Sequence, residues 1–341
     1  MGKYSIKTNS YSFLLHCGRW LRVSVCALPC AMTFALPATA LAQAWPQRPV
    51  RVVVPWAPGG ITDVLARLTA ERLAQSFGQP FIVDNRAGVA GNIGAELVAR
   101  ATPDGHTLMV TNPGAFATNQ FLYQKMNYKP ADFAGVILLG QFPNALMVYR
   151  DLPVKTVGDL IGYAKKNPTA LNGASSGSGS SGHLSLEMFK ALTGVQMQNV
   201  FYKGAALSKI DLAAGRVQVA IDNIPGYLSE LTSGTVRMLA VGTKSRLPGW
   251  PDIPTLDEAG VKGYESSVWY AMAAPRATAA NIVRRINEVA GNALRTPQMQ
   301  ERFKQLHGIP MGGTPEDANR YFAEETQRWK TIIAAAGIKP E

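Results

Sequence analysis

Short apolar runs alternate with longer runs in which apolar residues recur at helical spacing along most of this chain. The run VRVVVP at 50–55 predicts a strand, because consecutive β-branched residues favour an extended chain. Apolar residues then recur at helical spacing through residues 62–77, and Gly78 marks the end of the predicted helix. Alternation of this kind predicts parallel sheets with helices on both faces.

The same alternation continues to residue 273. It predicts further strands at 81–83, 106–111, 170–175, 199–202, 217–221, 236–241 and 264–273, and helices at 92–100, 156–166, 185–192, 205–214 and 225–232. Three final helices, at 279–294, 297–305 and 315–335, have no strands of their own and must pack on a sheet made elsewhere. We therefore predict a discontinuous first domain (43–142 plus 264–341) and an inserted second domain (143–263). Two chain crossings between the domains form a hinge, with a ligand cleft beside it.

The first 42 residues have the pattern of a signal peptide. They combine a basic start, an apolar run over 23–36 and the sequence Ala40-Leu41-Ala42, which matches the pattern that signal peptidase cuts. All cysteines lie in this segment, at Cys17, Cys26 and Cys30. Cleavage near Ala42 leaves 299 of the 341 residues and no cysteine. We expect a periplasmic protein without disulfides, and an uncleaved N-terminal anchor is the alternative.

The chain is basic, with a formal net charge of +11. Loss of the leader's Lys3, Lys7, Arg19 and Arg22 lowers this charge to +7. The remaining surplus either attracts anionic ligands or serves solubility. The basic residues form no dense run, so we expect no nucleic-acid partner.

Four predicted loops share one design, in which a strand ends, small residues follow and a helix begins. In the first, at 55–63, glycines allow the backbone to turn its amides toward a ligand, and Thr62 or Asp63 can cap the next helix. Free amides and the helix dipole together favour an anion. An ordinary glycine turn before a capped helix is the alternative.

The second loop, at 174–183, contains G-x-G-x-x-G at 177–182. A dinucleotide site also needs an acid after the next strand, and residues 199–203 contain none, so we reject a nicotinamide cofactor. An amide cradle for an anion remains, with a flexible linker as the alternative. The third loop lies at 202–206 and the fourth at 221–225. Asp222 in the fourth either binds a ligand hydroxyl or ammonium group or caps the next helix.

Few patterns in the sequence indicate catalysis or metal binding. Ser178 and Ser181 each lack a flanking glycine of G-x-S-x-G, no phosphate loop occurs, and the histidines after the leader, at 106, 183 and 307, have no metal-ligand spacing. We therefore expect no enzyme activity, no catalytic residue, no cofactor and no metal.

Five segments carry a family resemblance, in a fixed order along the chain. They are VVVPWAPGGITD at 52–63, VDNRAGVAGNIGAE at 83–96, PDGHTL at 103–108, YKG at 202–204 and LAVGTKSRLPGWPDIPTLDEAG at 239–260. In these the chain resembles the receptor proteins of tripartite tricarboxylate transporters, the Bug-type family, over essentially its whole length after the leader. The resemblance implies an α/β, two-domain periplasmic-binding-protein-like fold (type II), with parallel-rich sheets flanked by helices and a hinged ligand cleft. It also implies capture of a small carboxylate and its delivery to the permease subunits of a membrane transporter.

The resemblance implies ligand contacts from both domains, made largely by backbone amides and hydroxyls. They are Trp56, Ala57, Gly59, Gly60, Thr62, Asp63, Thr111 and Asn112 in the first domain, and Ser176, Ser181, Gly182, His183, Tyr202, Gly204, Ala205 and Asp222 in the second, with Trp269 near the hinge. Aromatic rings at Trp56, Phe116, Tyr202 and Trp269 suggest a ligand with an aromatic or extended apolar body, and packing in the core is the alternative. We expect a monomer.

Two other functions stay open from the sequence. One is a sensor subunit that presents its ligand to a signalling protein. The other is a secreted hydrolase that uses a serine of the 175–181 loop, for which His183 is the one nearby candidate base.

Overall fold

The computed structural model describes residues 45–177, 179–202, 204–335 and 337–340. The predicted signal peptide lies outside the described residues, as do Ser178 and Lys203 of the predicted loops. Residues Ala44–Glu341 form one compact unit. The division of this unit into two domains, at the boundaries given above, therefore stays a prediction.

Three parallel strands lie side by side at one end of the sheet, with β1 between β2 and β3. The elements in chain order are β1 (Val50–Val54), α1 (Ile61–Phe77), β2 (Phe81–Asn85), α2 (Asn92–Ala99) and β3 (Thr107–Thr111). Side chains of β1 alternate between two cores, because Val50, Val52 and Val54 face one cluster and Val53 faces another. Both faces of this part of the sheet are therefore buried.

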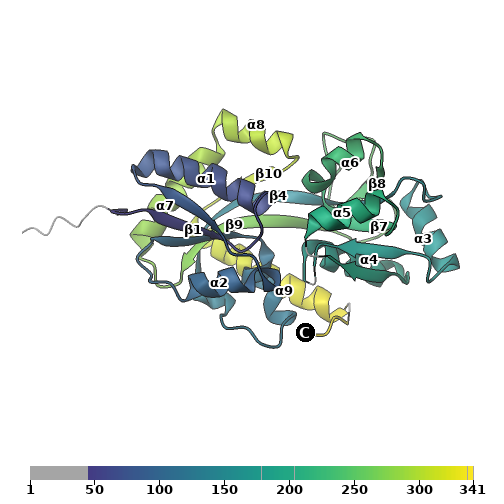
Figure 1. Ribbon diagram of the computed structural model, residues 1–341, viewed down its shortest axis with the longest axis horizontal. Coiled ribbons are helices and arrows are strands. Elements are labelled where there is room, and N and C mark those ends of the chain that lie inside the picture. The colour runs from purple at the N-terminus through teal and green to yellow at the C-terminus, as the bar shows by residue number, and fades with distance from the viewer. Residues whose placement is uncertain (1–44, 178, 203, 336, 341) are drawn as a thin grey trace, which may run out of the picture. The chain divides into compact units, whose positions relative to one another are not determined.

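The 17-residue strand β4 (Phe133–Tyr149) joins two parts of the sheet. Residues 133–143 pair antiparallel with β9 (Ser267–Pro275), and residues 144–149 pair antiparallel with β7 (Val219–Asn223) and β8 (Val236–Val241). β10 (Ile309–Gly312) also pairs with β4. In Figure 1, β4 and β9 run side by side between the part that carries α1 and α7 and the part that carries α3 to α6.

We call the part with β1, β2, β3 and β9 the first half, and the part with β5 to β8 the second half. The second half again contains parallel strands, since β5 lies between β6 and β7. Its remaining elements are α3 (Val157–Lys166), β5 (Asn172–Ser175), α4 (Ser181–Thr193), β6 (Gln198–Phe201), α5 (Ala205–Ala213), η5 (Ile224–Tyr227) and α6 (Leu228–Thr232).

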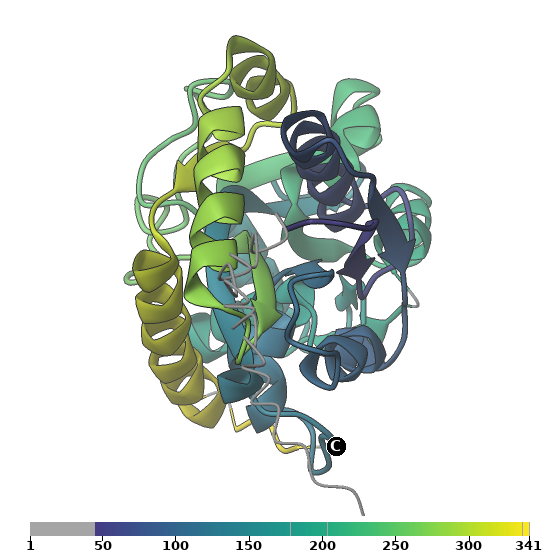
Figure 2. The same cartoon turned by 90° about the vertical axis from the view of Figure 1, so that its left-hand side faces the viewer.

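The C-terminal helices pack on the first half, as the sequence predicts. They are α7 (Ala280–Leu294), α8 (Pro297–Gln305) and α9 (Pro315–Ala335). α7 and α8 share a core cluster with α1 on one face of the sheet, whereas α9 shares the other cluster with α2. Figure 2 shows these layers from the end of the first half.

Most predicted elements agree with the structure to within a few residues, but β4 and the short strand β10 between α8 and α9 were not predicted. Nearly every residue of β4 is buried, so the strand has no alternation of apolar and polar positions, and periodicity alone gives no sign of a strand. The helix predicted at 185–192 begins earlier, at Ser181, because the Ser180 hydroxyl accepts the His183 amide and caps it there.

A buried polar cluster lies where β4 passes from β9 to β7. The side chain of Asn144 is fully buried, and its Nδ2 donates to Ser185 Oγ at 2.9 Å and to Ser266 Oγ at 2.7 Å. Asn223 Nδ2 donates to Asn144 Oδ1 at 2.7 Å, and Tyr270 Oη donates to Asn223 Oδ1 at 3.2 Å. Side chains from β4, α4, β7, β9 and the residue before β9 are thereby held in one network.

We expect Asn144→Ala to lower the free energy of unfolding by about 3 kcal/mol, because it leaves buried hydroxyl and amide groups without partners. Chemical denaturation measures this change. Asn167→Ala is the matched control, since Asn167 bonds only the Tyr163 carbonyl in an exposed position and its loss costs less than about 1 kcal/mol. Equal losses in the two variants would contradict the importance of this network.

Candidate functional site

The loop after β1 is anchored to the ends of two neighbouring strands. Trp56 Nε1 donates to Thr111 Oγ1 at 3.1 Å, and Asn85 Nδ2 donates to the Trp56 carbonyl at 3.1 Å. Thr111 is buried at the end of β3, and Asn112 after it accepts the Gly114 amide at 3.1 Å. The structure therefore brings Trp56 and Thr111 together, as the predicted site requires.

Asp63 organises this loop but does not act as the expected helix cap. The N-cap of α1 is Gly60 and has no side-chain cap. Asp63 instead reaches back, and its Oδ2 accepts the Gly59 amide at 3.0 Å while Oδ1 accepts Asn85 Nδ2 at 3.0 Å. Burial by itself raises the pKa of the Asp63 carboxyl, but hydrogen bonds from Arg67, Gly59 and Asn85 outweigh it and lower the pKa.

The exposed tip of the loop consists of small residues. Ala57, Gly59 and Gly60 are exposed, whereas Thr62 behind them is buried. Gly59 has a φ of 90°, a backbone conformation that would be strained for any residue with a side chain. The tip therefore exposes its backbone to solvent. The Asp63 carboxylate behind it is already bonded to Arg67 and to the Gly59 amide.

The loop after β5 leads directly into α4, whose first turn contains no acid. Ser180 Oγ accepts the His183 amide at 3.2 Å, and His183 Nδ1 accepts the Gly179 amide at 3.0 Å. His183 is buried and its ring meets Phe201 edge-on, with 4.9 Å between centroids. This histidine thus shapes the loop, and Ser181 beside it is half-buried.

The loops after β5 and β6 are joined through their backbones. The Tyr202 amide donates to the Ser175 carbonyl at 2.9 Å, and the Gly204 amide donates to the Ser176 carbonyl at 3.1 Å. Tyr202 Oη donates to Asp211 Oδ2 at 2.7 Å, and burial together with this carboxylate raises the pKa of Tyr202 to about 12. Ala205 then opens α5, so these predicted residues do lie together at one edge of the second half.

Asp222 lies at the end of β7, against the first turn of α4. It is 5% exposed, and its Oδ1 accepts the Asn223 amide at 2.8 Å, so it does not cap the following helix. A Cβ placed on Gly182 would lie 3.4 Å from Asp222 Oδ2 and 3.1 Å from the Ile221 carbonyl oxygen. Glycine at position 182 therefore permits this close contact between α4 and β7.

A segment that was not predicted from the sequence connects the loops of the two halves. Asn119 Nδ2 donates to the Ala90 carbonyl at 3.1 Å and to Asn92 Oδ1 at 2.6 Å, and a Cβ on Gly179 would come within 4.0 Å of Asn119. Val89 and Ala90 both have positive φ, at 45° and 49°, a strained backbone that is common at functional sites. The dense glycines of VDNRAGVAGNIGAE were the available sign of this turn.

Two of the four aromatic residues that suggested a flat ligand lie in the core. Trp269 is 1% exposed and stacks on Phe322 at 5.3 Å, and its indole donates to Glu325 at 2.9 Å. Phe116 stacks on the same two rings, with its centroid 6.0 Å from that of Trp269 and 4.3 Å from that of Phe322. Core packing, which was the alternative, is thus correct for Phe116 and Trp269, while Trp56 and Tyr202 are only partly buried.

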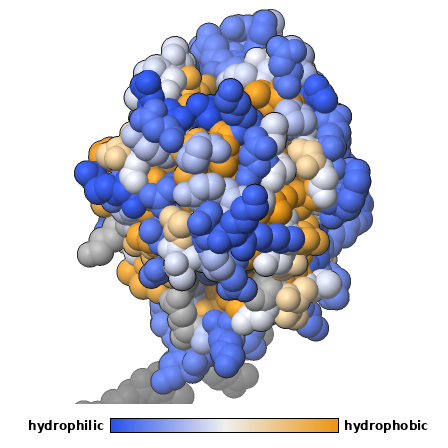
Figure 3. All heavy atoms as spheres, turned by 90° about the vertical axis from the view of Figure 1, so that its right-hand side faces the viewer, coloured by the Kyte–Doolittle hydropathy of each residue, from blue (hydrophilic) through white to orange (hydrophobic). Residues whose placement is uncertain are grey.

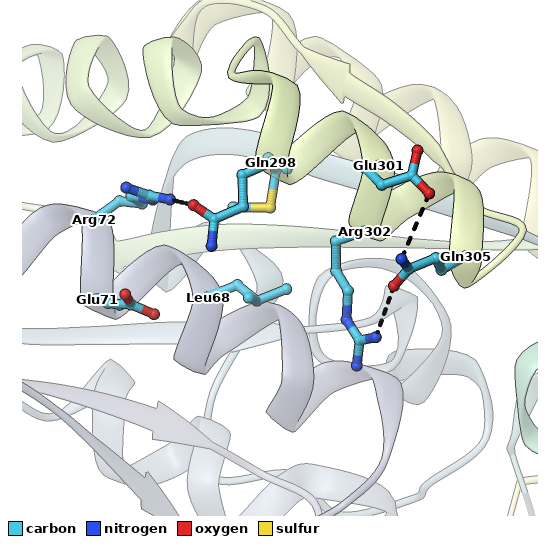
Figure 4. A pocket seen from close by; sticks show the side chains of 8 residues that line it. Leu68, Glu71, Arg72, Gln298, Glu301, Arg302 and Gln305 are labelled. Carbon is cyan, nitrogen blue, oxygen red and sulfur yellow. Dashed lines mark hydrogen bonds between the residues drawn. The ribbon is translucent and has the colours of Figure 1, made fainter.

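Two surface pockets are formed by other residues than these loops. A pocket of about 360 Å³ lies between α1 and α8, where Arg72 donates to Gln298 and Arg302 donates to Gln305 (Figure 4). Another, of about 560 Å³, lies between α8, β10 and residues 247–249, beside the contact of His307 with Trp250. The surface at the end of the second half is mainly polar, with apolar patches between (Figure 3).

Within the described ranges, we find no cluster of histidine, cysteine or carboxylate side chains that could hold a metal ion. We also find there no helix with the length and apolar character needed to cross a bilayer.

A family model described as the tripartite tricarboxylate transporter family receptor matches residues 65–338. The chain belongs to this receptor family. BugT of Bordetella pertussis is 33% identical over 309 residues, which are 90% of this chain and 95% of BugT. The family resemblance is therefore confirmed.

Two solved structures of similar proteins carry named ligands. Rpa4515 of R. palustris, solved with adipate, is 44% identical with a TM-score of 0.83, covering 87% of this chain and all of that one. MatC of Rhodopseudomonas palustris, with bound malate, is 32% identical with a TM-score of 0.78, covering 84% and 99%. These matches confirm the periplasmic-binding-protein-like fold and the solute-binding function of the receptor. The sheet departs from the expected parallel pairing around β4, where every neighbouring strand among the described residues is antiparallel.

Because hydrogen bonds lower the pKa of Asp63, its ionised form stabilises the folded receptor above the unfolded pKa of about 3.9, and this contribution disappears as pH falls through the folded pKa. We expect Asp63→Asn to lower the free energy of unfolding by about 2 kcal/mol near neutral pH and by much less at about pH 3. Denaturation of both proteins across this range measures the difference. Asp151→Asn, at an exposed acid, is the control. A difference independent of pH would contradict the role of the Asp63 charge.

Proposed function

We propose that this receptor captures a small aliphatic dicarboxylate at the loops that follow β1, β5, β6 and β7 and passes it to the permease subunits of a tripartite tricarboxylate transporter. The observation that carries the proposal is the full-length likeness to two proteins solved with dicarboxylates, adipate and malate. The predicted contacts described above belong to this proposal, except Trp269, whose ring is occupied in the core.

The first turn of α4 has the features that an anion needs. The amides of Ser181 and Gly182 belong to the first turn, where no intrahelical acceptor exists, and the described residues offer them no other acceptor. A helix of this length carries partial positive charge at its N-terminus. Small residues on both sides let a carboxylate approach these amides closely.

The first turn of α1 contributes less to anion binding. Asp63 already occupies its positive end, and Arg67 neutralises that carboxylate. We therefore assign the stronger electrostatic attraction for the ligand to α4. We expect the first loop to contact the ligand through its exposed backbone and the Trp56–Thr111 pair.

Thermal-shift and calorimetric titrations with adipate and malate test this proposal. A carboxylate at roughly 100 times its dissociation constant adds about 2.7 kcal/mol to the free energy of unfolding and raises the melting temperature visibly. We expect Gly182→Ala to weaken binding about tenfold, because the new methyl group lies 3.1 Å from the Ile221 carbonyl and displaces the first turn of α4.

Gly162→Ala is the matched control, because a methyl group on this helical glycine meets no atom within 4 Å. Unchanged affinity in Gly182→Ala would show that the carboxylate binds elsewhere.

We also expect benzoate to bind more weakly than adipate, since Phe116 and Trp269 are buried in the core and cannot stack on a ligand. Preference for benzoate would overturn the choice of an aliphatic ligand.

We infer that the receptor acts in the periplasm after removal of its leader. The proposal is supported by the basic start, the apolar run and the Ala40-Leu41-Ala42 sequence. Mass spectrometry of the exported protein should give a chain that begins close to Gln43. An exported protein that retains residues 1–42 would instead support the N-terminal anchor.

A further inference from the structure

Asp222 is a buried acid without a cationic partner among the described residues. Its side chain is 5% exposed, and its Oδ2 has no hydrogen-bond partner in that part of the chain. Within the described residues, the carboxylate accepts one hydrogen bond, from the adjacent Asn223 amide to Oδ1. A buried oxygen without a donor is costly, so its retention calls for an explanation.

The free oxygen points toward the end of α4 that we assign to the ligand. The distance of 3.4 Å from Asp222 Oδ2 to a Cβ built on Gly182 places the carboxylate against the first turn of that helix. An ionised Asp222 and a bound carboxylate would then share one positive helix end. Like charges at such close range destabilise each other, and protonation of one of them relieves this.

Among the described residues, the two tyrosines that interact with Asp222 supply no compensating charge. Tyr227 of η5 and Tyr270 of β9 interact with Asp222. Burial of the two phenols raises their pKa, the Asp222 charge raises it further, and both phenols are therefore neutral. His183 follows Gly182 on α4, and its Nδ1 accepts the Gly179 amide. β4 faces Asp222 with Ala145, its partner in the strand pair.

Resting on the proposed function, we propose that Asp222 is a ligand-site residue that takes up a proton when a carboxylate binds at the first turn of α4. The protonated acid removes the repulsion between the two carboxylates. The receptor then binds its anion together with a proton and loses affinity as pH rises.

The pH range over which the affinity changes follows from the pKa of Asp222 in the protein without ligand. Burial raises the pKa of Asp222 to about 6, against the smaller lowering effect of the Asn223 amide. A bound anion raises the pKa further, because it penalises the ionised form of Asp222. Affinity is therefore highest below about pH 6 and falls by up to tenfold per pH unit above it.

Calorimetry on the purified protein with adipate and malate tests this, in buffers of different ionisation enthalpy, which reveals the number of protons taken up. We expect the wild type to take up a fraction of a proton near neutral pH and to lose about tenfold in affinity from about pH 6 to about pH 8. Asp222→Asn, which keeps the shape and remains neutral, should take up no proton and keep its affinity at the higher pH.

Two controls separate this role from others. Asp257→Asn alters an exposed acid bonded to Gly263 and Lys262, and it should keep the pH dependence of the wild type. Melting temperatures report on folding, and Asp222→Asn should be more stable than the wild type at about pH 8 and similar at about pH 4.

Other outcomes overturn the inference in distinguishable ways. A pH dependence that persists in Asp222→Asn would assign it to another group, such as His183. Binding that is lost in Asp222→Asn at every pH would make the Asp222 carboxylate an acceptor for a ligand hydroxyl or ammonium group. In both cases the receptor function stands. Absence of carboxylate binding at about pH 6 and about pH 8 would overturn the proposed function and this inference together.

Discussion

The pairing of β4 with β9 is the constraint on which the rest of the structure depends. One continuous strand supplies hydrogen bonds to β9 and β10 in its first part and to β7 and β8 in its second. The Asn144 side chain fixes the point of transition, because it bonds hydroxyl groups from α4 and from the residue before β9. The strand β4, which orders the first half, thereby also positions the ends of β5 to β7 and the loops after them.

This arrangement explains why small residues suffice at the candidate site. The loops need no large side chain to hold their shape, since buried polar side chains behind them do so. Asp63 and Asn85 support the first loop, and His183 supports the second by accepting an amide at its turn. The surface in front can then remain backbone and glycine, which lets a ligand come close to amide groups.

The sequence alone predicted the alternating elements, the packing of the C-terminal helices and the four loops. It could not predict β4, because a strand buried on both faces lacks the periodicity that marks a half-exposed one. It also could not decide that Trp269 would stack in the core, since aromatic residues serve cores and clefts equally well. The link through Asn92 and Asn119 depends on contacts between segments 27 residues apart, which no local pattern encodes.

A receptor for anions gains from a positive helix end only if no resident charge cancels it. The two halves meet this requirement differently. In α1 the resident acid is ionised and paired with Arg67, so its charge is fixed and balanced locally. In α4 the neighbouring acid has no such partner among the described residues, and burial moves the pKa of Asp222 to about 6, where it can be ionised or neutral. A bound anion can therefore be stabilised by the positive N-terminus of α4, because Asp222 beside it can become neutral. The Asp63–Arg67 ion pair at α1 instead stabilises the conformation of the first loop.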